Sequence, residues 1–219
     1  MAALEAIFVT LAALLPIVNP LGSAPIFLAY SSDLPPAARR QLAWVVARNA
    51  LLLLVSAMLA GSHVLRFFGI SIPIVRVAGG LVVLATGWKL LHAGDEPDAP
   101  DSALTGPWER ETARRGFYPL TFPLTVGPGS VSVAITLGAG AALELDRLAG
   151  LVRVAGYLVG AGLVCAAIYV CYRFAPRLVG ALGDTGTSVF LRLSAFILLC
   201  VGVAIFWSGI VGLVQATRF

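Results

Sequence analysis

Charged residues are scarce in this sequence. Asp, Glu, Lys and Arg make up 12% of the 219 residues, against about 25% in a typical soluble domain. Hydrophobic residues reach 59%, which is more than one water-facing core can enclose. The three cysteines all lie inside apolar runs, without metal-ligand spacing. These features exclude a soluble domain, a disordered chain and a disulfide scaffold, and they indicate an integral membrane protein.

The apolar residues gather in long runs rather than in an alternating pattern. A bilayer core needs about 20 apolar residues per helix, whereas a barrel strand would alternate apolar and polar positions. Because lipid offers no partners to backbone groups, such runs must be helical. The sequence predicts an all-α, polytopic membrane protein with six spans, at 4–30, 42–65, 70–91, 117–141, 148–172 and 187–214.

One polar stretch, residues 94–116, divides the chain into two parts with three spans each, 1–93 and 117–219. The net charge is +4, but the basic residues stand in short clusters beside apolar runs, which argues against nucleic-acid binding. Lys and Arg are more frequent in the loops that follow spans one, three and five. The positive-inside rule makes that side cytoplasmic and places both termini outside. The two parts then have opposite orientations.

Two matching interruptions support an inverted repeat of three plus three helices. The first lies in the segment Pro16-Ile17-Val18-Asn19-Pro20-Leu21-Gly22-Ser23, within span one. The second lies in Pro123-Leu124-Thr125-Val126-Gly127-Pro128-Gly129-Ser130, within span four. A proline inside a helix costs about 3 kcal/mol, and interrupted helices in corresponding halves indicate the binding site of a transporter. The predicted helix-breaking residues are Pro16, Pro20, Pro25, Pro123 and Pro128.

The interruptions have the chemistry of a site for a small polar solute. A half-helix that begins after Gly22, and another after Gly129, would expose backbone N–H groups suited to a carboxylate. The side chains nearby are small and neutral, which suits a zwitterion or a polyol. The alternative is that the prolines only kink two helices whose neighbours satisfy the backbone. The candidate substrate-binding residues are Asn19, Gly22, Ser23, Thr125, Gly127, Gly129 and Ser130.

Acidic residues are absent from the central part of every predicted span. A carboxylate proton relay is therefore not evident. No grouping of nucleophile and base, and no metal-ligand set, is visible at mid-span, so we expect neither an enzyme nor a cofactor. Glycines in spans three, five and six, including the pair Gly156 and Gly160, predict close helix packing.

Two arginines fall inside predicted spans, Arg76 in span three and Arg192 in span six. They occupy corresponding places in the two halves. Each could extend to the lipid headgroups, or it could pair with carbonyls or a carboxylate at a gate.

Three segments together resemble the MarC family of membrane proteins. They are Asn19-Pro20-Leu21-Gly22-Ser23-Ala24-Pro25-Ile26-Phe27, Arg76-Val77-Ala78-Gly79-Gly80, and the stretch from Pro119 to Ser130. The resemblance implies a six-span inner-membrane protein of prokaryotes, grouped with transporters of small neutral amino acids. The second half has Gly127 where the first has Asn19, so one side-chain amide is offered instead of two.

The hypothesis from sequence is a secondary transporter of glycine or alanine that works by rocking one half against the other. Asn19 would contact the substrate, Gly22 and Gly129 would expose amides, and Ser23, Thr125 and Ser130 would set selectivity. Alternatives are an exporter of metabolites or drugs and a non-transporting structural protein. The sequence leaves open whether a proton or sodium ion drives transport and whether the chain forms a homo-oligomer.

Overall fold

The computed structural model describes residues 2–92, 112, 114–142 and 147–216. Within those ranges the chain is helical apart from short turns, and no strand is formed. The predicted all-α class is therefore confirmed for this part of the chain. Most of the predicted linker, residues 94–111 and 113, lies outside the described residues.

Five helices, together with one bent pair, have the length and composition to cross a membrane. If the bent pair counts as one span, the described residues hold six candidate spans, the number predicted from sequence. The spans in chain order are α1 (Ala2–Val18) with α2 (Pro20–Ala29), α3 (Pro36–Phe67), α4 (Ile72–His92), η1 (Gly116–Thr125) with α6 (Pro128–Ala142), α7 (Arg147–Arg173) and α8 (Ala175–Ala216). The second span begins earlier than the predicted 42–65, because Pro36 occupies the first turn of α3, where its missing N–H costs nothing.

A glycine divides α8 into two parts. Gly183 has φ 65° and ψ −179°, a backbone region that is essentially restricted to glycine. The short part, residues 175–182, precedes the membrane span Thr185–Ala216. The predicted span 187–214 lies within this second part.

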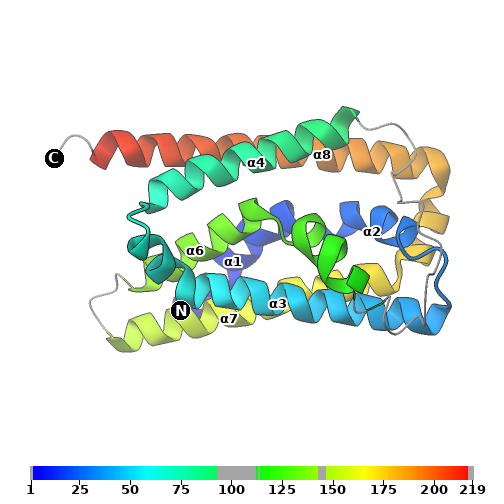
Figure 1. Ribbon diagram of the computed structural model, residues 1–219, viewed down its shortest axis with the longest axis horizontal. Coiled ribbons are helices and arrows are strands. Elements are labelled where there is room, and N and C mark those ends of the chain that lie inside the picture. The colour runs from blue at the N-terminus through cyan, green and yellow to red at the C-terminus, as the bar shows by residue number, and fades with distance from the viewer. Residues whose placement is uncertain (1, 93–111, 113, 143–146, 217–219) are drawn as a thin grey trace.

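The helices form an elongated bundle in which α1 begins and α8 ends at the same end, on the left in Figure 1. We call this the termini end. Helices α4 and α8 lie side by side as one layer, which faces the other four spans. Among those four, α1 packs chiefly on α7, and α3 packs on α6 and η1. The contacts therefore interleave the two halves of the chain instead of separating them.

Glycines bring the backbones of α4 and α8 close together. A Cβ atom at Gly80 would lie 2.4 Å from the backbone N of Phe206, and one at Gly202 would lie 2.7 Å from that of Leu84. Helix α7 meets α1 in the same way, since a Cβ atom at Gly156 would lie 2.6 Å from the carbonyl O of Ala3. The predicted role of these glycines in close packing is confirmed.

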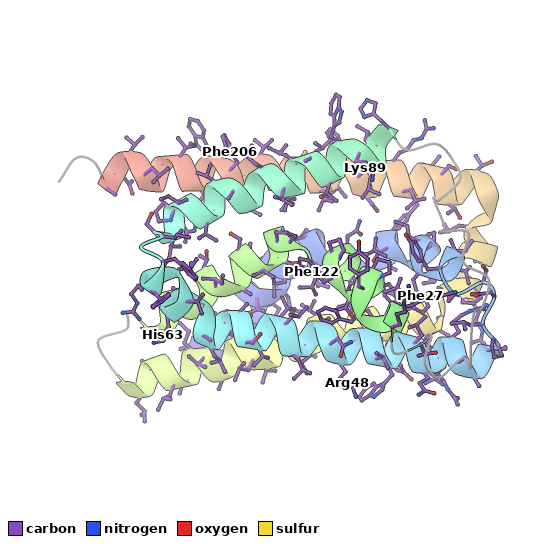
Figure 2. All side chains as sticks on the ribbon, viewed as in Figure 1. Phe27, Arg48, His63, Lys89, Phe122 and Phe206 are labelled. Carbon is purple, nitrogen blue, oxygen red and sulfur yellow. The ribbon has the colours of Figure 1, made fainter. Side chains whose placement is uncertain are left out.

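Large apolar side chains cover the outside of the bundle, and Figure 2 shows them projecting outward along α4 and α8. Trp44, Trp88 and Trp207 are 58%, 60% and 64% exposed. Such a surface suits lipid rather than water. The buried core lies among α1, α2, α3, α6 and α7, and it includes Leu14, Phe27, Leu42, Leu54, Ile168 and Tyr172.

Candidate functional site

The first interruption is a single residue, Asn19, between α1 and α2. Its φ of 43° and ψ of 60° are left-handed, a conformation that asparagine tolerates better than most residues. The Oδ1 atom of Asn19 accepts a hydrogen bond from the backbone N of Gly22 at 3.1 Å, so Asn19 caps α2. A Cβ atom at position 22 would lie 2.2 Å from Nδ2 of Asn19, which explains the glycine. The cap needs both residues.

This geometry corrects two expectations. Helix α2 begins at Pro20 and not after Gly22, because proline is favoured in the first turn of a helix. The expectation of a free amide at Gly22 is wrong, since that amide is occupied by the cap. Hydrogen bonds also continue across the break, from the N of Asn19 to the O of Leu15 and from the N of Ser23 to the O of Asn19. The bend is mild enough for residues Ala2–Ala29 to form one span.

The second interruption is longer and includes the whole of η1. Tyr118 and Phe122 are extended inside it, as expected for residues that precede proline. The hydroxyl of Thr121 donates to the carbonyl O of Gly116, and that of Thr125 donates to the carbonyl O of Leu120 at 2.6 Å. These hydroxyls satisfy backbone oxygens in an irregular segment. The axis bends by 71° between η1 and α6.

Helix α6 begins at Pro128, in the middle of the bundle, and runs to the termini end (Figure 1). Its start was predicted after Gly129, and the difference again reflects proline in the first turn. The carbonyl O of Gly127 accepts hydrogen bonds from the N of Val131 at 3.1 Å and from Oγ of Ser130 at 3.0 Å. Gly129 and Ser130 lie in the first turn of α6, where backbone N–H groups have no partner within the helix, and among the described residues no side chain caps them. We call this helix start open because, among the described residues, no side chain caps it, whereas Asn19 caps the start of α2.

Tyr172, in the last turn of α7, connects the two interruptions. Its hydroxyl lies 2.7 Å from Oγ1 of Thr125 and 3.0 Å from Oγ of Ser23. Ser23 in turn donates to the carbonyl O of Asn19 at 2.9 Å. Tyr172 is fully buried, and its ring stacks on Phe27 with the centroids 4.4 Å apart. The interrupted spans therefore meet at one side chain.

The hydroxyl groups of Ser23, Thr125 and Tyr172 have three hydrogens for four oxygen–oxygen contacts of 3.0 Å or less. The hydrogen of Ser23 serves the carbonyl O of Asn19, and that of Thr125 serves the carbonyl O of Leu120. Tyr172 has one hydrogen for two oxygen neighbours. One oxygen–oxygen contact is therefore always without a hydrogen, and the cluster can accept one more donor.

Sequence reasoning did not identify Tyr172. A tyrosine near the end of a span has the same sequence pattern as an anchor at the membrane interface. The burial of its hydroxyl follows from its contacts with Ser23 of α2 and Thr125 of η1, which the local sequence does not reveal.

The structure does not bring the two membrane arginines to the interruptions. Arg76 contacts Oγ1 of Thr136 and Oγ of Ser208, and Arg192 lies on the exposed side of α8. The end of α2 is instead joined to the start of η1 by Arg115, whose Nη1 lies 2.9 Å from Oδ1 of Asp33. The same nitrogen donates to the carbonyl O of Tyr30. The far ends of the interrupted spans are therefore held together by an ion pair.

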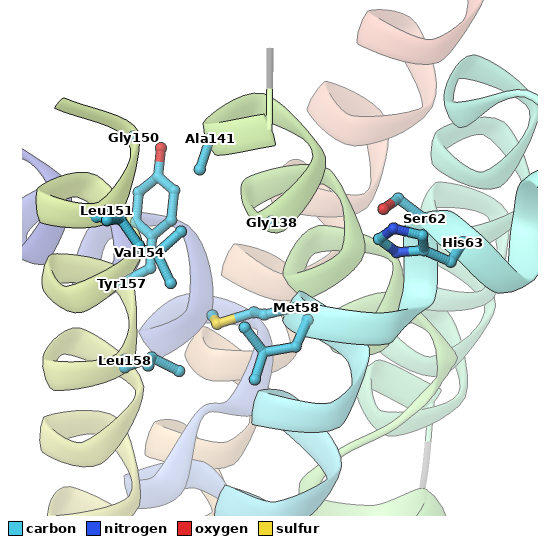
Figure 3. Close-up of a pocket in the computed structure, with 11 residues that line it drawn as sticks. Met58, Ser62, His63, Gly138, Ala141, Gly150, Leu151, Val154, Tyr157 and Leu158 are labelled. Carbon is cyan, nitrogen blue, oxygen red and sulfur yellow. The ribbon is translucent and has the colours of Figure 1, made fainter. Parts of the chain in front are cut away.

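A cavity of about 400 Å³ lies apart from the interruptions, between α3, α6 and α7. Figure 3 shows Ser62 and His63 on one side of it and Leu151 and Tyr157 on the other. Most of its lining is apolar, so it does not suit a zwitterion. Among the residues that the structure describes, no group of His, Cys, Asp or Glu could hold a metal ion.

Comparison with known proteins gives a consistent result over nearly the whole chain. A family model described as MarC family integral membrane protein matches residues 4–214. The chain is 28% identical over 217 residues to inner membrane protein MarC of Salmonella typhimurium, with 96% of each chain covered. It is 28% identical over 214 residues to the protein of that name in Citrobacter koseri, and 29% over 215 residues to the one in Escherichia coli, with 96% of each chain covered in both cases. No solved structure matches.

Proposed function

The chain belongs to the MarC family of multi-pass inner-membrane proteins, and on that premise we propose that it is a secondary transporter of small neutral amino acids such as glycine and alanine. The observation that carries the proposal is the meeting of two interrupted spans at Tyr172, through Ser23 and Thr125. Non-helical backbone at membrane depth is tolerated only where protein buries it or where it lines a cavity. A transport site gives these interruptions a reason.

The polar groups at the interruptions match the two ends of a zwitterion. The uncapped N–H groups of Gly129 and Ser130 lie in the first turn of α6, whose partial positive charge favours a carboxylate. The hydroxyl cluster around Tyr172 lacks one hydrogen, and an ammonium group can supply it. Among the described residues no carboxylate lies at the interruptions, so a neutral solute fits better than a cation.

The space at the start of α6 favours a small solute. A Cβ atom at Gly129 would lie 2.0 Å from Cγ2 of Val83. Ser23, Thr125 and Tyr172 are all buried in this conformation. We infer that the site is closed here and that a solute enters when the Tyr172 hydroxyl separates from one of its two neighbours.

The helix pairing supports an inverted repeat. In such a repeat, spans one, two and three correspond to spans four, five and six. The contact between spans one and five (α1 with α7) then corresponds to the contact between spans four and two (α6 with α3), and both contacts are present. The pairing of α4 with α8 is converted into itself. Because the halves are interleaved, we propose that the moving unit is the α4–α8 layer rather than one half of the chain.

The charge distribution supports termini outside the cell. Arg39 lies in the first turn of α3, Lys89 is near the end of α4, and Arg173 ends α7, all at the end opposite the termini. Arg66 is near the termini end of α3. By the positive-inside rule the end richer in Lys and Arg faces the cytoplasm.

Counterflow of radiolabelled glycine in proteoliposomes tests the proposal. Vesicles preloaded with unlabelled glycine should accumulate label, with competition by alanine but not by leucine or glutamate. Imposed proton and sodium gradients identify the coupling ion. Competition only by lipophilic compounds would favour the exporter alternative, and the apolar cavity at Met58 and Tyr157 would become the candidate site. No flux of any solute would favour a structural role.

A further inference from the structure

Arg76 is a cation inside a membrane span whose partners are two neutral hydroxyls. Its Nε donates to Oγ1 of Thr136 on α6, and its Nη1 donates to Oγ of Ser208 on α8, both at 3.4 Å. These bonds are long for hydrogen bonds to nitrogen donors, which are usually about 2.9–3.0 Å. Helices α4, α6 and α8 thus each supply one polar side chain to this cluster.

The guanidinium has more donors than these contacts use. It carries five N–H groups and has no acceptor. Within the described part of the chain, Arg76 has no acidic partner. Charged side chains inside a membrane normally pair with an opposite charge or with several oxygens. The arrangement therefore lacks an anion.

The backbone around Arg76 is held in place by packing of α4 against α6. The residue before Arg76 contacts α6, where Oγ of Ser132 donates to the carbonyl O of Val75 at 2.9 Å. A Cβ atom at Gly79 would lie 2.6 Å from Cβ of Ser132. Helices α6 and α8 have little direct contact, so the Arg76 side chain bridges them.

We propose that Arg76, Thr136 and Ser208 form a binding site for an oxyanion, either the carboxylate of an amino acid or the phosphate of a lipid headgroup. Guanidinium groups bind both through paired, charge-assisted hydrogen bonds. The two hydroxyls add neutral donors that can turn toward the same ligand.

The carboxylate case deepens the proposed function and rests on it. Thr136, Ser132 and Gly129 lie on one face of α6, which points to α4. Gly129 is about 10 Å from Thr136 along the axis, at a rise of about 1.5 Å per residue. Arg76 would receive the carboxylate near the termini end, and the amides of Gly129 and Ser130 would hold it at the centre.

The test measures ligand binding by the full-length protein in a delipidated maltoside micelle, which contains no phosphate. The probes are glycine, acetate, which lacks the ammonium, and methylamine, which lacks the carboxylate. For wild-type protein we expect binding of glycine and acetate but not of methylamine. Arg76→Gln should weaken glycine and acetate binding by about tenfold or more, the usual effect of losing a hydrogen bond to a charged group. The matched control is Arg66→Gln, at an exposed arginine on the termini end of α3, which should leave binding unchanged.

A second arm tests the phosphate source. Protein purified from membranes rich in phosphatidylglycerol is weighed by native mass spectrometry, and retained lipid is counted. If a lipid phosphate is the ligand, Arg76→Gln should lose the retained lipid, and Arg66→Gln should keep it. Because this arm needs no amino acid, it succeeds or fails independently of the transport proposal.

Two further variants guard against misfolding of Arg76→Gln. Arg76→Lys keeps the charge and should retain part of the binding. The double variant Thr136→Val with Ser208→Ala keeps the arginine and should weaken binding by a few fold, about the effect of losing neutral hydrogen bonds. Wild-type affinity for glycine and acetate together with unchanged lipid retention in Arg76→Gln would overturn the proposal.

Discussion

The two interruptions have similar sequences and opposite local chemistry. Asn19 closes the break in span one with its own side chain, by capping the amide of Gly22. Gly127 stands at the equivalent place before Pro128 and has no side chain with which to cap α6. The amides of Gly129 and Ser130 are therefore left without a side-chain cap among the described residues. In the proposed transport site, we therefore assign the solute-facing role to α6 and the fixed side of the site to α2.

Substitution of Gly129 by Leu should have the largest effect. A Cβ atom there would lie 2.0 Å from Cγ2 of Val83, and the rest of a leucine side chain would cover the open amides. We expect glycine flux to fall to background and stability to fall by about 1–3 kcal/mol, as for other overpacked sites. The matched control on the same helix is Gly140→Leu, because a Cβ atom at Gly140 has nothing within 4 Å. Equal flux in the two variants would show that the start of α6 is not part of the site.

Tyr172→Phe should have the next largest effect, because it disconnects the interruptions while keeping the ring stacked on Phe27. The oxygens of Ser23 and Thr125 lose a buried partner, so we expect a loss of about 1–3 kcal/mol in the free energy of unfolding. Glycine affinity should fall with it. The control is Tyr169→Phe, since within the described chain the Tyr169 hydroxyl only accepts a hydrogen bond from Arg173 at the surface. A Tyr172→Phe protein with unchanged stability and flux would contradict the connected site.

Gly127→Asn should convert the open interruption into a capped one. A Cβ atom at Gly127 has one close neighbour, the carbonyl O of Pro123 at 3.1 Å, so a small adjustment admits the side chain. The new cap would stabilise α6 by up to about 1 kcal/mol and would compete with the substrate carboxylate. We expect higher thermal stability with weaker glycine binding, measured on the same preparation, whereas Gly127→Ala should show neither a cap nor strong competition. Tighter glycine binding in Gly127→Asn would contradict the role given to the α6 amides.

Asn19→Ala should have the smallest effect on glycine flux, with a loss of about 0.5–2 kcal/mol in stability from the missing cap. Asn19→Asp keeps the acceptor oxygen, so it should retain the cap and most of the stability. The pair also separates two roles, because Nδ2 of Asn19 has no partner in the described chain and could donate to substrate. Flux preserved in Asn19→Asp would limit Asn19 to capping, and flux lost at full stability would give Nδ2 a direct contact.

Much of the fold was predictable because lipid imposes strict rules. Long apolar runs predicted six spans, which agrees with the described residues when the bent pair counts as one span, and proline and glycine predicted where spans one and four break. From the sequence, the start of α2 was predicted after Gly22, whereas the helix begins at Pro20 with Asn19 as its cap. This cap depends on a left-handed backbone at Asn19, which the residue type allows but does not require. The connection through Tyr172 was not predictable, since it joins residues 149 positions apart. The ion pair between Arg115 and Asp33 was missed for the same reason.

The most direct test of a solute held between the two interruptions is protection from chemical labelling. Ser130→Cys and Ser23→Cys are each treated with a membrane-permeant thiol reagent, with and without glycine, on a background in which the three native cysteines are replaced by serine. The account predicts that glycine slows labelling at both positions and that leucine slows neither. Equal labelling rates with and without glycine, in a protein that still exchanges glycine, would contradict a site between the two spans.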